Sequence, residues 1–130
     1  MVFGEKEEYK DEHVHFVVTC SEQGILEAVF VGTGSQAGTE KFISIVEHAL
    51  VFFVPQTLCV LMDLRQQSSV PLRTQLRMGT WLLQVKDKIA KIAILGGGKT
   101  AQLVAKGAKL QSIQFFSQES EDDAKNWLSS

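Results

Sequence analysis

The sequence contains few of the features that mark membrane, secreted or nucleic-acid-binding proteins. Its 130 residues include only two cysteines and two prolines, and 13 Lys and Arg against 15 Asp and Glu give a formal net charge of −2. A chain without excess positive charge lacks the footprint expected for nucleic acids or acidic lipid surfaces. The longest apolar stretch, residues 49–62, is interrupted at 55–57 and is too short to span a bilayer. We therefore predict one cytoplasmic domain with no membrane span and no nucleic-acid partner.

The cysteines and the N-terminal segment show no sign of a secreted protein. Cys20 and Cys59 lie in apolar runs typical of strands, where a free thiol packs as a small apolar side chain. A disulfide between them stays open at this point. Residues 1–12 are rich in charge and lack the apolar run of a signal peptide. We predict a flexible N-terminal lead-in at 1–12 and a single domain at 13–130.

Hydrophobic periodicity along residues 13–130 predicts alternating strands and helices. The short turn at 21–24 predicts that the first two strands form a hairpin. Ser35 or Thr39 is expected to cap the first helix, and Ser120 with Asp123 forms a capping box before the last one. The predicted elements are strands at 13–20 and 25–33, a helix ending before Pro55, a strand at 57–64, a helix at 71–88, a strand at 90–95, a short helix at 99–106, a strand at 110–116 and a final helix in which Ala124, Trp127 and Leu128 dock on the core.

This order predicts an α/β domain with a five-stranded mixed sheet in the order 1-2-3-4-5. Right-handed crossovers between neighbouring strands place the helices mainly on one face, and only strand 1 runs antiparallel to the others. The other face would then expose apolar side chains of the central strand, among them Cys59 and Leu61. Such a face indicates self-association or a protein partner, unless the N-terminal segment covers part of it.

The helix at 71–88 adds a second candidate for contacts. Four of its residues form one apolar stripe at helical spacing: Leu72, Leu76, Gly79 and Leu83. Met78, Leu82 and Val85 widen that stripe. Trp81 lies outside it, and either reaches the sheet or anchors a partner at an interface.

Several segments resemble the STAS domains, the family of anti-sigma-factor antagonists, and more closely their SpoIIAA-like branch. The resemblance covers about residues 13–129. It rests on Leu61-Met62-Asp63-Leu64 as the central strand, Lys91-Ile92-Ala93-Ile94-Leu95-Gly96 as the fourth strand with its glycine turn, and Ile113-Gln114-Phe115-Phe116 followed by Ala124-Lys125-Asn126-Trp127-Leu128 at the end. The resemblance implies a βα superhelix that acts as a non-enzymatic regulatory or protein-interaction module, as a homodimer or with another protein.

The loop after the central strand carries a phosphorylatable serine in anti-sigma-factor antagonists, normally within Asp-Ser-Ser-Gly. Here the loop contains Ser68 and Ser69 but lacks the acidic residue and the glycine, which argues against a kinase switch. Serines before a helix N-terminus could still receive a phosphate or bind an anion, and the alternative is an N-cap or loop role. Asp63 and Arg65 could contact a ligand or hold the loop. The shared architecture of CRAL-TRIO domains implies an alternative function, carriage of a lipid or another small apolar ligand on the apolar face or beneath residues 42–53.

The glycine turn Gly96-Gly97-Gly98-Lys99 calls for a comparison with the phosphate-binding P-loop. Together with Ala93 and Thr100 it matches a loose Walker A pattern. Ala93, however, lies inside the predicted strand, and the remaining glycines are too few to encircle a phosphate. Weak anion binding by this turn, or a simple strand-to-helix turn, fits better. His13 and His15 have no evident third metal ligand. The sequence thus predicts no catalytic residues, metal or cofactor.

Overall fold

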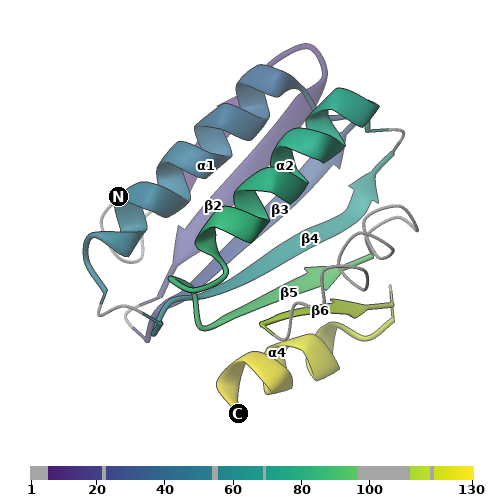
Figure 1. The fold of residues 1–130 in the computed structure, drawn as a ribbon. Helices are drawn as coiled ribbons and strands as arrows, with labels where there is room; N and C mark the ends of the chain where they lie inside the picture. Colours follow the sequence, from purple (N-terminus) through teal and green to yellow (C-terminus); the bar gives the residue numbers. More distant parts are fainter. Residues whose placement is uncertain (1–5, 22, 54–55, 69, 97–111, 118) are drawn as a thin grey trace.

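The computed structural model describes residues 6–21, 23–53, 56–68, 70–96, 112–117 and 119–130. These residues form one sheet with helices packed on both faces, as Figure 1 shows. The elements are β1 (Lys6–Lys10), β2 (Val14–Cys20), β3 (Ile25–Gly32), α1 (Gln36–Leu50), β4 (Cys59–Gln67), α2 (Leu72–Val85), β5 (Lys91–Leu95), β6 (Ile113–Phe116) and α4 (Glu121–Ser129). The helix predicted at 99–106 lies outside the described residues.

The strands follow one another in the sheet in chain order, from β1 to β6. β1 pairs antiparallel with β2, and β2 pairs antiparallel with β3, whereas all later pairs are parallel. β2 alone therefore runs against the others, which confirms the predicted mixed sheet of sequential neighbours and its antiparallel strand at 13–20. The number of strands was wrong, because the described sheet has six strands rather than five.

The additional strand comes from the segment predicted as a flexible lead-in. Residues 6–10 pair with residues 15–19 of β2. The Tyr9 ring stacks on Phe16 with ring centroids 5.3 Å apart, so one side of β1 packs on the sheet beside α1. Lys6, Glu8 and Lys10 alternate with it on the exposed side. The charged residues that led us to predict a flexible segment lie on the exposed face of an edge strand. Charges at such a position also oppose edge-to-edge aggregation.

An aromatic cluster fills the space between the sheet and the two long helices. Phe16 and Phe30 of the sheet meet Phe42 of α1, with ring centroids 5.1 to 6.1 Å apart. Trp81 of α2 contacts Phe42 at 5.9 Å and is only 1% exposed. Such edge-to-face and tilted contacts stabilise a core beyond simple burial. The interpretation of Trp81 as a surface anchor is wrong, since its ring is a core side chain.

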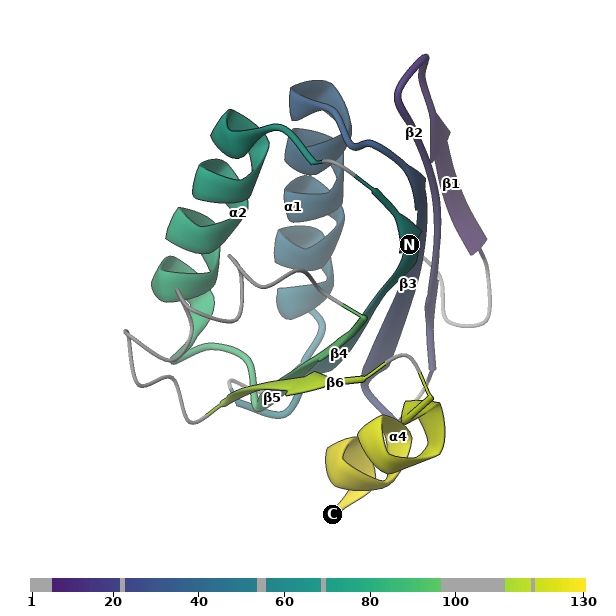
Figure 2. The same ribbon diagram turned by 90° about the vertical axis from the view of Figure 1, so that its right-hand side faces the viewer.

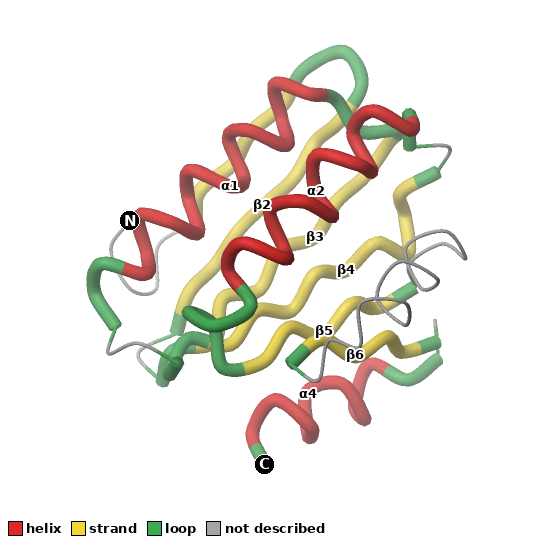
Figure 3. The backbone as a smooth tube through the Cα atoms, in the orientation of Figure 1, coloured by secondary structure: helices red, strands yellow, loops and turns green. Residues whose placement is uncertain are grey.

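The opposite face of the sheet is partly covered by α4, as Figure 2 shows. α4 contacts β4, β5 and β6, and Figure 3 shows it beside the end of the sheet that holds β5 and β6. Ala124 and Leu128 of α4 pack against Leu61 of β4 together with Ala93 and Leu95 of β5. We expected this face to be open or covered by the N-terminal segment. The short C-terminal helix covers it instead, and Leu61 is 1% exposed.

The two predicted helix caps have different outcomes. The Ser35 hydroxyl accepts a hydrogen bond from the Gly38 backbone N–H at 2.9 Å, which confirms Ser35 as the cap of α1. The capping box before α4 was wrong. The Ser120 side chain makes no cap and instead lies 2.7 Å from the Ser117 hydroxyl, so a neighbouring side chain competes for its hydrogen bond.

Candidate interaction surface

The carboxyl end of β4 brings two of the predicted site residues together. Asp63 is 5% exposed. The Arg65 guanidinium donates two hydrogen bonds to its carboxylate, from Nε to Oδ1 at 3.0 Å and from Nη2 to Oδ2 at 2.7 Å. The backbone N–H of Arg65 donates to the same Oδ1 at 3.1 Å. Arg65 also reaches α4, where Nη2 donates to Glu121 Oε1 at 3.0 Å.

These contacts fix the charge of the cluster. Burial alone would raise the pKa of Asp63. The hydrogen bonds from the side chain and backbone of Arg65 together outweigh this effect, so the pKa of Asp63 lies below its ordinary value. The hydrogen bond to Asp63 holds the pKa of Arg65 above its usual range. Asp63 is therefore ionised and already paired. Its geometry suits positioning of α4 against the sheet better than capture of a cation from solution.

Ser68 lies in an exposed position in the loop between β4 and α2. Its backbone N–H donates to the Gly32 carbonyl at 2.9 Å. α2 begins at Leu72, directly after Pro71, and no side chain caps it. Ser68 is thus a loop residue and not the cap of α2, and Ser69 lies outside the described residues. A phosphate or anion at Ser68 or Ser69 stays a prediction.

Only the first residue of the glycine turn lies within the described chain. Gly96 has φ +78°, and its N–H donates to the Phe116 carbonyl at 2.9 Å. A Cβ at this position would lie 2.9 Å from Arg65 Cγ and 3.2 Å from Arg65 Cα. Glycine is needed here because β5 approaches the backbone of β4 too closely for any side chain. Gly97, Gly98 and Lys99 are not described, so anion binding by this turn stays a prediction.

Three of the exposed large apolar side chains among the described residues lie on α2, and the others are Val31, Val51 and Phe52. Leu72 is 64% exposed, Leu76 59% and Leu83 43%. The buried side chains of this helix are Thr74, Trp81 and Val85. In Figure 2 α2 lies in the outer helical layer beside α1. The leucines of the predicted stripe face solvent. The prediction that Met78, Leu82 and Val85 widen it was wrong, because Met78 and Leu82 pack against the core and Val85 is buried beside Trp81.

An ion pair joins this helix to α1. Arg77 Nε and Nη2 donate to the two carboxylate oxygens of Glu40, at 2.5 and 3.2 Å. The hydrogen bond from Arg77 lowers the pKa of Glu40, and Glu40 raises the pKa of Arg77. The charge of Arg77, which lies in the middle of α2, is therefore compensated within the chain.

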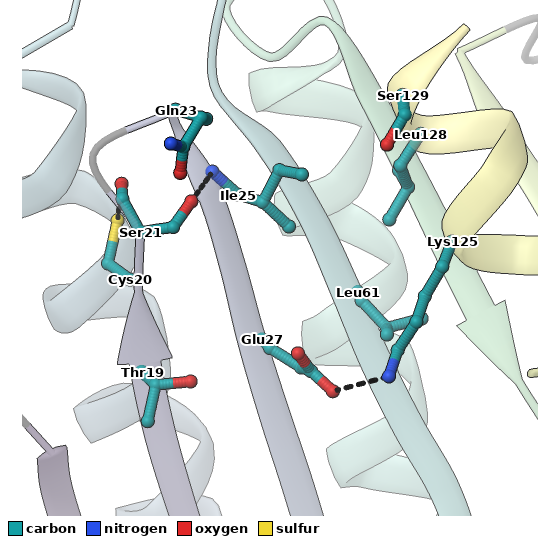
Figure 4. Close-up of a pocket in the computed structure, with 10 residues that line it drawn as sticks. All are labelled: Thr19, Cys20, Ser21, Gln23, Ile25, Glu27, Leu61, Lys125, Leu128 and Ser129. Carbon is teal, nitrogen blue, oxygen red and sulfur yellow. Dashed lines mark hydrogen bonds and ion pairs between the residues drawn. The ribbon is translucent and has the colours of Figure 1, made fainter. Parts of the chain in front are cut away.

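A groove with a volume of about 530 Å³ lies on the α4 face, between the β2–β3 hairpin and α4. Figure 4 shows Lys125 reaching across it toward Glu27, with Nζ 3.8 Å from Oε1. Ile25, Leu61 and Leu128 supply apolar surface, but the lining also contains hydroxyl, amide and charged groups. The groove is open to solvent, whereas a lipid carrier is expected to enclose most of its ligand.

The two cysteines lie on opposite faces of the sheet, Cys20 in the core beneath α1 and α2 and Cys59 beneath α4. Burial raises the pKa of the Cys20 thiol, which donates to the Ser21 carbonyl at 3.7 Å. Burial also raises the pKa of Cys59, whose thiol donates to the Leu128 carbonyl of α4 at 3.7 Å. Both thiols are free. Cys59, predicted as an interface residue, is half-buried beneath α4 rather than on an open face.

Within the described residues, no helix has the length and apolar character needed to cross a membrane. The same part of the chain holds no group of three His, Cys, Asp or Glu placed to bind a metal ion. His15 lies 3.3 Å from the Glu8 carboxylate through its Nε2, within the β1–β2 pair.

Comparison with known proteins identifies the family. The SpoIIAA-like family model matches residues 25–129. An uncharacterised protein of the DUF3478 family from Shewanella loihica PV-4, with a SpoIIAA-like fold, superposes with a TM-score of 0.65 at 20% sequence identity, covering 92% of this chain and 98% of that one. Among curated proteins, none matches. The family match spans most of the chain, and the solved structure shows the same fold. The chain belongs to the SpoIIAA-like family and is a STAS-like domain.

Proposed function

We propose that this protein is a non-enzymatic interaction module whose contact surface is the outer side of α2. The observation that carries the proposal is the exposure of Leu72, Leu76 and Leu83 on one stripe of a helix. Scattered single apolar residues on a surface are ordinary, but a contiguous apolar stripe marks a contact site. Binding of a helix or a flat protein surface would remove these side chains from water.

The arrangement of the rest of the molecule supports this choice of surface. The α1 and α2 layer is closed against the sheet by the aromatic cluster, so the leucines are not needed to fill the core. α4 covers part of the opposite face, which removes the sheet itself as the first candidate. Asp63 and Arg65 pair with each other, and Arg65 also pairs with Glu121, so these side chains hold the carboxyl end of β4 against α4.

The proposal is tested by cross-linking in cells of the host. Tagged wild-type protein, Leu76→Glu and Val51→Glu are compared, because Val51 is 78% exposed at the C-cap of α1 and provides an apolar-to-acidic control outside α2. We expect a defined set of cross-linked proteins that is lost in Leu76→Glu and retained in Val51→Glu. An identical set in all three proteins would overturn α2 as the working surface.

Carriage of a small apolar ligand is the second candidate. The aromatic rings of Phe16, Phe30, Phe42 and Trp81 pack against one another beneath α1, in the region where such a ligand would have to enter. We rank it below the interaction module because the groove found among the described residues is open to solvent and does not enclose a ligand. Native mass spectrometry of protein purified from its host distinguishes the two. A discrete small-molecule adduct would reverse this ranking.

A further inference from the structure

The stripe on α2 has the spacing of a seam between two helices. Leu72, Leu76, Gly79 and Leu83 follow at intervals of four, three and four residues. Alternating steps of three and four residues are those of the seam positions in paired helices. The seam lies on the side of the helix opposite to Thr74 and Trp81, which are buried in the core. α2 therefore uses one side for its own fold and presents the other as a ready contact.

We propose that α2 packs antiparallel against α2 of a second copy of this chain, about a two-fold axis between Arg77 and Met78. The stripe is symmetric about that point. Leu72 and Leu83 lie equally far from it, and so do Leu76 and Gly79. In an antiparallel pair Leu72 faces Leu83 of the other copy, and Leu76 enters the space left by the missing side chain of Gly79. A two-fold contact requires this kind of self-complementary surface.

The parallel arrangement fits the same stripe less well. It would place each Gly79 against its own copy and leave a gap in the middle of the seam, which costs contacts on both helices. It would also align the two helix dipoles, whereas the antiparallel arrangement opposes them. The symmetry of the stripe is the reason to prefer a second copy over the helix of an unrelated protein.

The charges near the axis permit this approach. Arg77 is level with the axis along the helix, but the helical repeat places it away from the leucine stripe, on the side of α2 that faces α1. There its guanidinium donates two hydrogen bonds to Glu40 of its own chain, so the charge of Arg77 does not enter the contact. The stripe itself is uncharged. Like-charge repulsion therefore does not oppose the pairing at its centre.

The size of the contact sets its strength. α2 has 14 residues, which makes it about 21 Å long. With a width of about 10 Å, the helix offers a footprint of roughly 200 Å², well below the roughly 800 Å² per partner of stable complexes. We expect a weak dimer that forms as the concentration rises. This inference rests on the proposed interaction surface and names one occupant for it.

Sedimentation equilibrium from micromolar to millimolar concentration tests the pairing. The average mass of the wild type and of Val51→Glu should rise toward that of a dimer, whereas Leu76→Glu should stay monomeric. Circular dichroism checks that the variants remain folded. A wild type that stays monomeric throughout would overturn the two-copy contact. The cellular cross-linking experiment would still decide whether α2 binds other proteins, so the two failures are distinguishable.

Disulfide cross-linking tests the direction of the pair. Leu72→Cys is mixed with isotopically labelled Leu83→Cys under mild oxidation, with the unaltered chain as the control for its native cysteines. An antiparallel pair should give predominantly the mixed disulfide between the two variants. Leu72→Cys alone cross-linking to itself faster than the mixture would overturn the antiparallel register. Equal yields from all combinations would show random collision and would overturn the defined contact.

Discussion

Replacing Leu61 with alanine should destabilise the protein far more than the same replacement at Leu72. Leu61 is 1% exposed and packs under α4, whereas Leu72 is 64% exposed on α2. Truncation of a buried leucine costs about 2–5 kcal/mol, depending on how well the site can relax. Because Leu61 also borders the groove beside α4, neighbouring side chains and water can partly fill the space. We therefore expect about 2–3 kcal/mol, at the lower end of that range.

Urea denaturation followed by far-UV circular dichroism measures both variants at low micromolar concentration, where the proposed dimer does not contribute. Leu72→Ala should change the free energy of unfolding by no more than about 0.5 kcal/mol, as is usual for exposed sites. For a chain of this size, the Leu61→Ala loss should lower Tm by about 10 °C. Equal and small effects at both positions would refute the burial of this sheet face by α4. A large loss at Leu72 would refute the solvent exposure of the α2 stripe.

Three further results follow from the structure. Gly32→Ala should destabilise the protein by at least about 2 kcal/mol in urea denaturation, because φ is +106° and the added Cβ would lie 2.3 Å from the His13 carbonyl oxygen; a neutral effect would contradict this geometry. Hydrogen bonds, chiefly from Ser35, hold the pKa of Asp11 far below its usual range. The loss of unfolding free energy in Asp11→Asn should therefore be largest at neutral pH and shrink below about pH 4. Urea denaturation of both proteins at pH 7 and pH 3 measures this difference. Because burial raises the pKa of both Cys20 and Cys59, iodoacetamide should label the folded protein at pH 7 much more slowly than the unfolded chain, and equal rates by mass spectrometry would contradict their burial.

Local patterns in the sequence were sufficient for most of the described elements. The hairpin of β2 and β3, the helix capped by Ser35 and the apolar run of β4 lie within a few residues of their predicted positions. Each depends on periodicity, turn residues or caps that neighbouring residues determine. The order of the strands also follows from the sequence, because short right-handed crossovers restrict how sequential strands can pair.

The features that the sequence analysis missed depend on distant contacts. β1 is composed mostly of charged residues, and its strand conformation comes from pairing with β2 and from the stacking of Tyr9 on Phe16. The cover of the second sheet face depends on where α4 docks, which periodicity within α4 cannot tell. Lys91 at the start of β5 helps to hold α4 in place, because its Nζ donates to the Trp127 carbonyl at 2.7 Å. That contact spans 36 residues, so it has no local sequence pattern.

α2 has two apolar faces, one buried against the sheet and one exposed to solvent. Its sequence holds one apolar set around Trp81 and Val85 and another along the leucine stripe, and together they exceed the width of a single buried face. The sheet selects the set with Trp81, because that ring meets Phe42 in the aromatic cluster and leaves no room for the stripe on the same side. The two sets can then be separated by experiment. Truncation in the first should lower the stability of the monomer, whereas truncation at Leu76 should leave the monomer stable and weaken only association.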